Sequence, residues 1–253
     1  MLLGRPYLRG YCDVSGFSHI TDWVFDLDNT LYPAECQLFA QIDKRMTDYV
    51  AQVLSVDLAE ARRVQKQLYV DHGTTLAGLM INHKVEPEHF MDFVHDIDVS
   101  GVPTNTRLAQ MITALPGRRF VFTNGSVRHA ENVMGKLGIT ACFDGIFDVT
   151  AAGYIPKPHA QAYERFLKAY DIEPTNAAMF EDLAVNLEVP GELGMTTVLV
   201  CSESGWIADE PSAKRPAHPN DHAPHVDHRT TDLTEFLSTV KTSSTPVDLA
   251  AAL

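Results

Sequence analysis

The chain has 253 residues, of which 45% are hydrophobic and 21% charged, as in ordinary globular proteins that bury a core. Its formal net charge of −13 at pH 7 argues against an extended nucleic acid polymer as a partner, although a local cationic pocket can still attract a small phosphate ester. No apolar run approaches the roughly 20 residues that cross a bilayer, and the cysteines are scattered, as suits a reducing compartment. We therefore expect a cytoplasmic protein with no membrane partner.

The first part of the chain passes from strand to helix signals. Residues 1–20 lack a long apolar segment, and we interpret them as an N-terminal extension outside the fold. The run 23–25 (Trp-Val-Phe) is the first strand signal. From 33 to 102 the apolar residues recur at helical spacing without a strand signal, which predicts an all-helical block. The helices expected in this block are residues 39–53, 58 to about 72, and 87–94.

Strand and helix signals alternate in the rest of the chain. The short apolar runs predicted to be strands are 118–122, 146–149, 177–180 and 195–200. The predicted helices are 127–137, 162–170 and one that ends near 193. Short, continuously apolar strands between helices are typical of a parallel sheet that is covered on both faces. Residues 202–230 are rich in Pro, His and Asp, and we interpret them as a surface loop.

These signals predict an α/β fold: a doubly wound, Rossmann-like parallel-sheet core with an inserted all-helical cap. The core is expected to comprise residues 21–32 and 103–240, and the cap residues 33–102. Residues 241–253 are interpreted as a C-terminal tail. Ligands of such sheets bind beyond the carboxyl ends of the strands, so that edge is where a functional site is expected.

Polar side chains follow four of the predicted strands. In strand order they are Asp26 and Asp28, Thr123 and Asn124, Lys157 after a loop, and Glu181 and Asp182. Taken alone, each group is more often a turn, a helix start or solvated surface. Because the carboxyl ends of parallel strands share one edge, four such groups in this order favour a single crevice that contains them all.

The chemistry of these residue types suits phosphate transfer. Clustered carboxylates repel one another unless a cation neutralises them, and hard oxygen ligands select Mg²⁺. A phosphate dianion also repels an attacking carboxylate, so Lys157 would screen the phosphate on one side and the metal on the other. One carboxylate can then attack phosphorus to form an aspartyl-phosphate. A second acid protonates the departing alkoxide and afterwards takes a proton from water.

The motifs resemble those of the haloacid dehalogenase superfamily, in its phosphatase branch, over about residues 20–240. The first motif of that superfamily, Asp-x-Asp-x-Thr, stands here as residues 26–30, and Thr123, Lys157 and Asp182 match its second, third and fourth motifs. The resemblance implies that the helical block is a lid that closes over the active site and selects the substrate.

The same resemblance implies a role for each motif residue. Asp26 would be the nucleophile and Asp28 the general acid/base. The residues implied for phosphate or substrate binding are Thr123, Asn124 and Lys157, and those for metal binding are the Asp26 side chain, the Asp28 backbone carbonyl and Asp182. Asn186 stands where many members have a further acid, and Phe180-Glu181-Asp182 departs from the commoner Gly-Asp. The division of roles among Glu181, Asp182 and Asn186 therefore stays open.

Three segments resemble the pyrimidine 5′-nucleotidase subgroup more narrowly: residues 28–33, 72–79 and 122–125. This makes uridine or cytidine monophosphate the leading substrate class, a small phosphorylated metabolite. His72, Thr74 and Thr75 would then be cap contacts to the base or sugar. Equally, this segment can be a helix stop followed by a capping threonine.

Several alternatives remain open. The substrate can be another small ester, such as phosphoglycolate or a sugar phosphate, because the motifs are common to all of these. A dehalogenase is disfavoured, since it has no leaving-group oxygen for Asp28 to protonate. A non-catalytic binding protein of the same fold is disfavoured because no motif residue is missing. The sequence leaves monomer or homodimer undecided.

A group of histidines invites a metal-site interpretation. They are His218, His222, His225 and His228. Their spacing would suit one helical face, but Pro219 and Pro224 interrupt any helix, and a solvated loop is the favoured interpretation.

Overall fold

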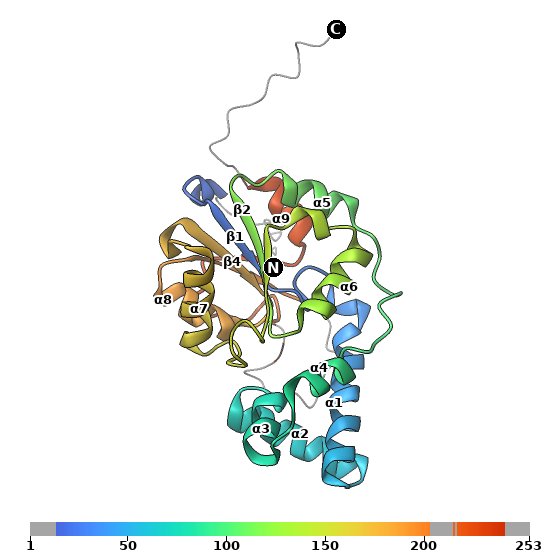
Figure 1. The fold of residues 1–253 in the computed structure, drawn as a ribbon. Helices are drawn as coiled ribbons and strands as arrows, with labels where there is room; N and C mark the ends of the chain where they lie inside the picture. The colour runs from blue at the N-terminus through green and yellow to red at the C-terminus, as the bar shows by residue number, and fades with distance from the viewer. Residues whose placement is uncertain (1–13, 203–214, 216, 241–253) are drawn as a thin grey trace, which may run out of the picture.

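The protein is described from a computed structural model, in which residues 14–202, 215 and 217–240 are described. Six strands form one sheet in the order β3-β2-β1-β4-β5-β6, and every adjacent pair is parallel. The strands are β1 (Asp22–Phe25), β2 (Arg118–Phe122), β3 (Gly145–Phe147), β4 (Ala177–Glu181), β5 (Thr196–Val200) and β6 (His228–Thr230). The α/β, doubly wound parallel fold expected from the sequence is confirmed (Figure 1).

Helices cover both faces of this sheet. Helices α5 (Thr106–Thr113), α6 (Val127–Leu137) and α9 (Leu233–Thr239) share one apolar cluster with side chains of the sheet, and α7 (Ala160–Tyr170) belongs to the cluster on the opposite face. In β1, Trp23 and Phe25 pack into the first cluster and Val24 into the second. Burial on both sides explains why residues 23–25, 177–180 and 198–200 of β1, β4 and β5 are continuously apolar instead of alternating.

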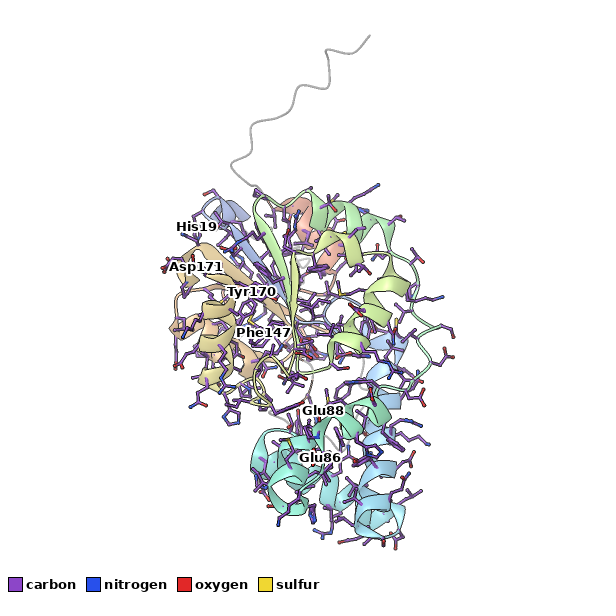
Figure 2. All side chains as sticks on the ribbon, viewed as in Figure 1. His19, Glu86, Glu88, Phe147, Tyr170 and Asp171 are labelled. Atoms are coloured by element: carbon purple, nitrogen blue, oxygen red, sulfur yellow. The ribbon has the colours of Figure 1, made fainter. Side chains whose placement is uncertain are left out.

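The second cluster is rich in aromatic rings. Phe147 at the end of β3 and Tyr170 at the end of α7 both belong to it, with ring centroids 6.3 Å apart (Figure 2). Phe166 lies 4.8 Å from Phe122, in a stacked arrangement. Buried aromatic pairs contribute about 0.5–1.5 kcal/mol each beyond their area burial, so this face anchors β2 and β3 firmly to α7.

Four further helices, α1–α4, follow β1 and form a group of their own, here called the helical insertion (Figure 1). They are α1 (Leu38–Leu54), α2 (Leu58–His72), α3 (Thr75–His83) and α4 (Pro87–Val94). Their inward faces share an apolar cluster that includes Ile42, Val50 and Phe90. Gly73 ends α2 in the left-handed region (φ 82°), where glycine carries no Cβ penalty.

The structure corrects the N-terminal boundary taken from the sequence. Phe17 and Ile20 were placed in an extension outside the fold, but their side chains are 0% and 2% exposed and belong to the core of the sheet. Two apolar residues separated by two others give no periodic pattern, so their burial depends on tertiary contacts. Residues 1–13 and 241–253 of the expected extension and tail lie outside the described residues.

Other differences concern short elements. Strand β6 lies within residues 202–230, which were interpreted as loop; its sequence His-Arg-Thr is half-buried at the sheet edge and has no apolar run. Helices α3, α5 and α9 were not predicted. The helix expected to end near 193 is a 3₁₀ turn, Ala184–Leu187, followed by the short α8 (Glu188–Glu192). In the described part of the chain, no helix is long and apolar enough to span a membrane.

Candidate active site

Three acids meet where β1 and β4 end. The two strands pair with Phe25 opposite Phe180, and the backbone N–H of Asp26 donates to the carbonyl of Phe180 at 2.9 Å. The residues at the carboxyl ends of the two strands are therefore brought side by side. One carboxylate oxygen from each of Asp26, Glu181 and Asp182 lies within 4.8 Å of the others, and all three residues are buried.

Lys157 is the cation inside this cluster. Its Nζ donates to Asp26 Oδ1 at 2.7 Å, to Glu181 Oε1 at 2.9 Å and to the carbonyl of Phe122 at 2.9 Å. These three bonds use the three protons of an ammonium group. Burial disfavours the charged form, but Asp26 and Glu181 outweigh it and raise the pKa of Lys157 above its ordinary value.

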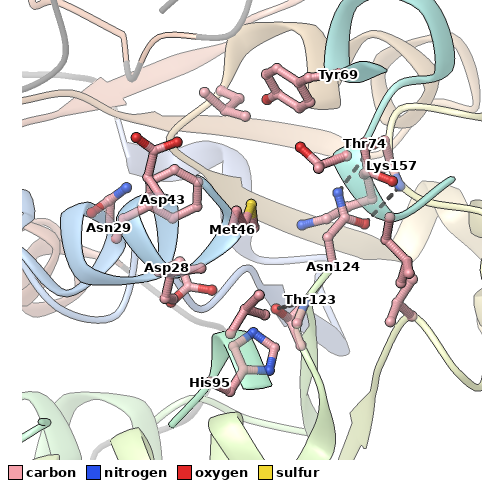
Figure 3. Close-up of a pocket in the computed structure, with 18 of the residues that line it drawn as sticks. Asp28, Asn29, Asp43, Met46, Tyr69, Thr74, His95, Thr123, Asn124 and Lys157 are labelled. Carbon is pink, nitrogen blue, oxygen red and sulfur yellow. Dashed lines mark hydrogen bonds between the residues drawn. The ribbon is translucent and has the colours of Figure 1, made fainter. Parts of the chain in front are cut away.

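Asn124 holds the loop that carries Lys157. Its side-chain oxygen accepts from the Lys157 backbone N–H at 2.8 Å, and its Nδ2 donates to the Lys157 carbonyl at 3.1 Å (Figure 3). The loop after β3 is thereby tied to the end of β2. Thr123, the residue before it, is buried, and its hydroxyl accepts from the Gly125 N–H at 2.9 Å. Both residues predicted from the second strand end lie at the site.

Glu181 and Asp182 differ in what they bond. Both oxygens of Glu181 are occupied: Oε1 accepts from Lys157 and Asn186, and Oε2 from the Leu183 N–H at 2.8 Å. Asp182 makes a long contact, 3.5 Å from the Asn29 amide to Oδ2, and a side-chain contact with Glu181. Asp182 is thus held by fewer and longer hydrogen bonds than Glu181.

The cluster carries more negative charge than Lys157 balances. Burial raises the pKa of Asp26 to about 7, with Glu181 and Asp28 adding to the rise against the charge of Lys157. Burial, together with Glu181 and Asp26, also raises the pKa of Asp182 well above its ordinary value. Carboxylates that cannot all ionise in a dry site are chemically suited to a divalent cation. Within the described ranges, no other His, Cys, Asp or Glu group has this close spacing.

Asp28 stands apart from that cluster and has partners of its own. Its Oδ1 accepts from the Tyr32 hydroxyl at 2.6 Å and from His129 Nε2 at 2.8 Å. Burial alone would raise the pKa of Asp28, but the charge and hydrogen bond of His129 and the hydrogen bond of Tyr32 lower it to about 2. Sequence reasoning missed His129. It is 101 residues from Asp28, and its one signal is its place in the first turn of the helix after Thr-Asn-Gly.

A cavity lies between the strand ends and the helical insertion (Figure 3). On the core side it is lined by the acids, Thr123, Asn124 and Lys157. The apolar side chains that line it from the insertion are Phe39, Ile42, Met46, Leu76, Phe90, Met91 and Val94. The predicted Thr74 and Thr75 also line the cavity, whereas His72 does not; its Nε2 lies 3.3 Å from Asn82 Nδ2. The Thr74 hydroxyl caps α3 by accepting from the Ala77 N–H.

A second polar group, missed in the sequence, lines the cavity from α1 and α2. Asp43 is buried and accepts from Arg62 Nη1 at 2.8 Å, from Gln65 Nε2 at 2.7 Å and from Lys66 Nζ at 2.8 Å. Asp43, Gln65, Lys66 and the nearby Tyr69 all face the cavity. The donors are about 20 residues from the acceptor along the chain, so no local motif marks the group.

The histidines near the C-terminus do not gather. His225 Nε2 donates to the carbonyl of Ala184 at 2.7 Å, and His222 Nδ1 lies 2.9 Å from Arg229 Nη2. His228 belongs to β6, so the loop interpretation was wrong for this residue.

Comparison with known proteins places the chain among hydrolases. Residues 24–190 match the family model described as haloacid dehalogenase-like hydrolase. Over 132 residues the chain is 25% identical to phosphate metabolism protein 8 of Saccharomyces cerevisiae. This match covers 48% of this chain and 41% of the yeast protein. The chain therefore matches less than half the length of that relative.

Two solved structures have a similar fold. A HAD phosphatase from Thermococcus onnurineus is 15% identical to this chain, with a TM-score of 0.56. The match covers 87% of this chain and 97% of the chain of that phosphatase. L-2-haloacid dehalogenase from Xanthobacter autotrophicus is also 15% identical, with a TM-score of 0.53, covering 87% and 98%. At such identities the likeness concerns the fold.

Proposed function

This chain belongs to the haloacid dehalogenase-like hydrolase family, and we propose that it hydrolyses phosphate monoesters through a phosphorylated Asp26, with Mg²⁺ bound beside it. The observation that carries this proposal is the meeting of Asp26, Lys157 and Asp182, from three distant parts of the chain, in one buried cluster at the edge of the cavity.

The residues divide the chemistry as follows. Asp26 attacks phosphorus, so that an O–P bond forms to its carboxylate while the bond to the ester oxygen breaks. Lys157 holds Asp26 in place and supplies positive charge to the phosphoryl oxygens. Asp28 gives a proton to the departing oxygen and then takes one from the water that hydrolyses the aspartyl-phosphate. Thr123 contacts the phosphoryl group, and Asn124 keeps the Lys157 loop in position.

The donor set fits a hard divalent cation. The side chains of Asp26 and Asp182 and the backbone carbonyl of Asp28 would hold it, since both oxygens of Glu181 are already used. Bound there, Mg²⁺ would neutralise the excess carboxylate charge and polarise the phosphoryl group. Glu181 has a different role in this arrangement: with Asn186 it fixes the position of Lys157.

We propose the helical insertion as the cap that selects the leaving group, and pyrimidine nucleoside monophosphates as the substrate class. The cavity offers aromatic and apolar side chains to a ring, among them Phe39, Phe90 and Tyr69. It also offers polar groups at Gln65 and Thr75 to ring carbonyls or sugar hydroxyls. Other small phosphate esters, such as phosphoglycolate and sugar phosphates, are the competing substrates.

The arrangement around Asp28 favours an esterase over a dehalogenase. A halide leaving group takes no proton, so an acid held at the cavity by two hydrogen bonds would have no leaving-group oxygen to serve. Ester cleavage uses such an acid in both of its half-reactions.

Phosphate release from a panel of esters tests the proposal. The panel contains uridine and cytidine monophosphates, a purine monophosphate, phosphoglycolate, a sugar phosphate and p-nitrophenyl phosphate, each with Mg²⁺ and with EDTA. We expect metal-dependent release, fastest with the pyrimidine nucleotides, and a loss of at least about 10³-fold in Asp26→Asn. A chloroalkanoic acid serves as the dehalogenation control. Full activity of Asp26→Asn, or release unaffected by EDTA, would contradict the mechanism; a different fastest ester would change the substrate alone.

A further inference from the structure

The Asp28 carboxylate is held from one side only. Tyr32 and His129 both bond Oδ1, and no hydrogen bond from the described residues reaches Oδ2. Asp28 lines the cavity, and its side chain is 17% exposed (Figure 3). An ionised carboxylate only accepts, so Nε2 of His129 carries the proton of that hydrogen bond. One oxygen of Asp28 is thus anchored and the other is available to a ligand.

His129 is placed rigidly for this contact. Its backbone lies in the first turn of α6, where its N–H donates to the Ser126 hydroxyl at 3.3 Å. Its ring is 1% exposed and stacks on His95, with centroids 4.4 Å apart and planes 9° apart. His95 Nδ1 also lies 3.0 Å from the Ser126 hydroxyl oxygen. Ring plane and ring position are therefore set by contacts other than the bond to Asp28.

Packing alone does not explain a histidine here. Nδ1 of His129 is buried and has no hydrogen-bond partner among the described residues. An unpartnered buried polar atom costs stability, and an apolar side chain of similar size would avoid that cost. The feature that distinguishes histidine at this position is the hydrogen bond that Nε2 donates to Asp28.

We propose that His129 is a positioning residue for Asp28: with Tyr32 it fixes Oδ1, so that Oδ2 faces the ester oxygen and then the attacking water. This inference rests on the proposed function. The negative charge of the bound phosphate group favours the protonated form of Asp28, whose proton lies on Oδ2 because Oδ1 already accepts two hydrogen bonds. In the first half-reaction this proton passes to the leaving oxygen as its bond to phosphorus breaks. In the second, Oδ2 takes a proton from water as the water oxygen bonds to phosphorus and the Asp26 carboxylate leaves. One carboxylate serves both steps, so it must keep one orientation.

The stacked rings of His95 and His129 also join the helical insertion to the core that contains the sheet. His95 directly follows α4, and its ring presses on the ring that anchors Asp28. The end of the helical insertion therefore helps to set the position of the acid that serves the cavity.

Two leaving groups separate a positioning role from a merely structural one. An alkyl phosphate needs the proton from Asp28, whereas the p-nitrophenolate of p-nitrophenyl phosphate leaves without it. Because both esters share the hydrolysis of the aspartyl-phosphate, the rate to compare is single-turnover release of the leaving group. In His129→Leu we expect this rate to fall about 10–100-fold for the best alkyl ester of the panel and less than about threefold for p-nitrophenyl phosphate. His129→Gln keeps an N–H donor and is expected to recover most of the loss. Single-turnover release of p-nitrophenolate in the same sample reports that the variant is folded.

Tyr32→Phe removes the other donor to the same oxygen, so a smaller loss with the same preference for the alkyl ester is expected. In Asp28→Asn, adding His129→Leu should cause no further loss, because the histidine acts through Asp28. Equal losses of single-turnover leaving-group release on both esters in His129→Leu and Tyr32→Phe, or a further loss in the double variant, would overturn the inference. Absence of phosphate release by the unaltered protein, or full activity of Asp28→Asn, would instead overturn the proposed function.

Discussion

The two walls of the cavity balance charge in different ways. On the core wall, three buried carboxylates face one ammonium, Lys157, and burial, with repulsion between the carboxylates adding to it, raises the pKa values of Asp26 and Asp182. On the wall formed by the helical insertion, one buried carboxylate, Asp43, receives three donors from α2. The core wall thus carries excess negative charge and suits a cation. On the insertion wall the carboxylate of Asp43 is paired with donors of the same wall. Chemistry and selection of the leaving group are therefore expected to be separable by mutation.

The largest effect is expected where the core wall loses its cation. Lys157→Met leaves Asp26 and Glu181 buried without a counter-charge, and breaking such a pair costs about 3–5 kcal/mol of unfolding free energy. Urea unfolding in EDTA measures this. Lys44→Met, at a lysine whose side chain is 77% exposed, is the matched control and should change stability by less than about 0.5 kcal/mol. A similar small change in both variants would mean that the core wall is not dry.

A smaller effect is expected on the insertion wall. Asp43→Ala deprives Arg62, Gln65 and Lys66 of their acceptor; because the Arg62 side chain is 35% exposed, the cost is discounted to about 2–3 kcal/mol. If selection lies on this wall, KM for nucleotides should rise more than KM for p-nitrophenyl phosphate. Asp96→Ala, at an exposed carboxylate that pairs with Arg45, is the control. An equal rise for both esters would place the effect on the core wall instead.

The free energy of unfolding should depend on pH through His95, which lies where the helical insertion contacts the core. Burial, with the charge of His129 adding to it, lowers the pKa of His95 to about 3, whereas an unfolded histidine titrates near 6.5. Below pH 6.5 the unfolded chain binds a proton that the folded chain rejects, so stability falls as the pH falls from 6.5 towards 3. Between pH 7.5 and 5 the unfolding free energy should drop by about 2 kcal/mol more in the unaltered protein than in His95→Phe. Parallel pH profiles of the two proteins would contradict this.

The smallest effect is expected at an exposed ion pair between the core and the helical insertion. Arg128 of α6 lies 3.0 Å from Asp92 of α4, with side chains 64% and 69% exposed. Such a pair contributes little in water, and Arg128→Ala should change the thermal midpoint by no more than corresponds to about 0.5 kcal/mol. A clearly larger shift would mean that surface charge, and not the buried His95–His129 stack, holds the insertion to the core.

Sequence patterns located the regular elements and the strand ends. The bounds of β2, α6 and α4 agree with the predicted ranges, since each is marked by a strong apolar pattern with a start or stop signal, such as Gly138 after α6. The same patterns predicted that Asp26, Lys157 and Asp182 lie at one edge of the sheet, because the carboxyl ends of parallel strands lie together. Strand β6 and the burial of Phe17 were missed, because neither is marked by such a pattern.

What tertiary structure alone decided is which atoms meet. Glu181 and Asp182 are neighbours with the same chemistry, and only the hydrogen bonds to Lys157, Asn186 and the Leu183 N–H separate their environments. The bond from His129 to Asp28 joins residues on different elements. Periodicity and capping act over a few residues and are written in the local sequence. A hydrogen bond depends on ångström-scale placement of two side chains that packing brings together, and no local pattern encodes that placement.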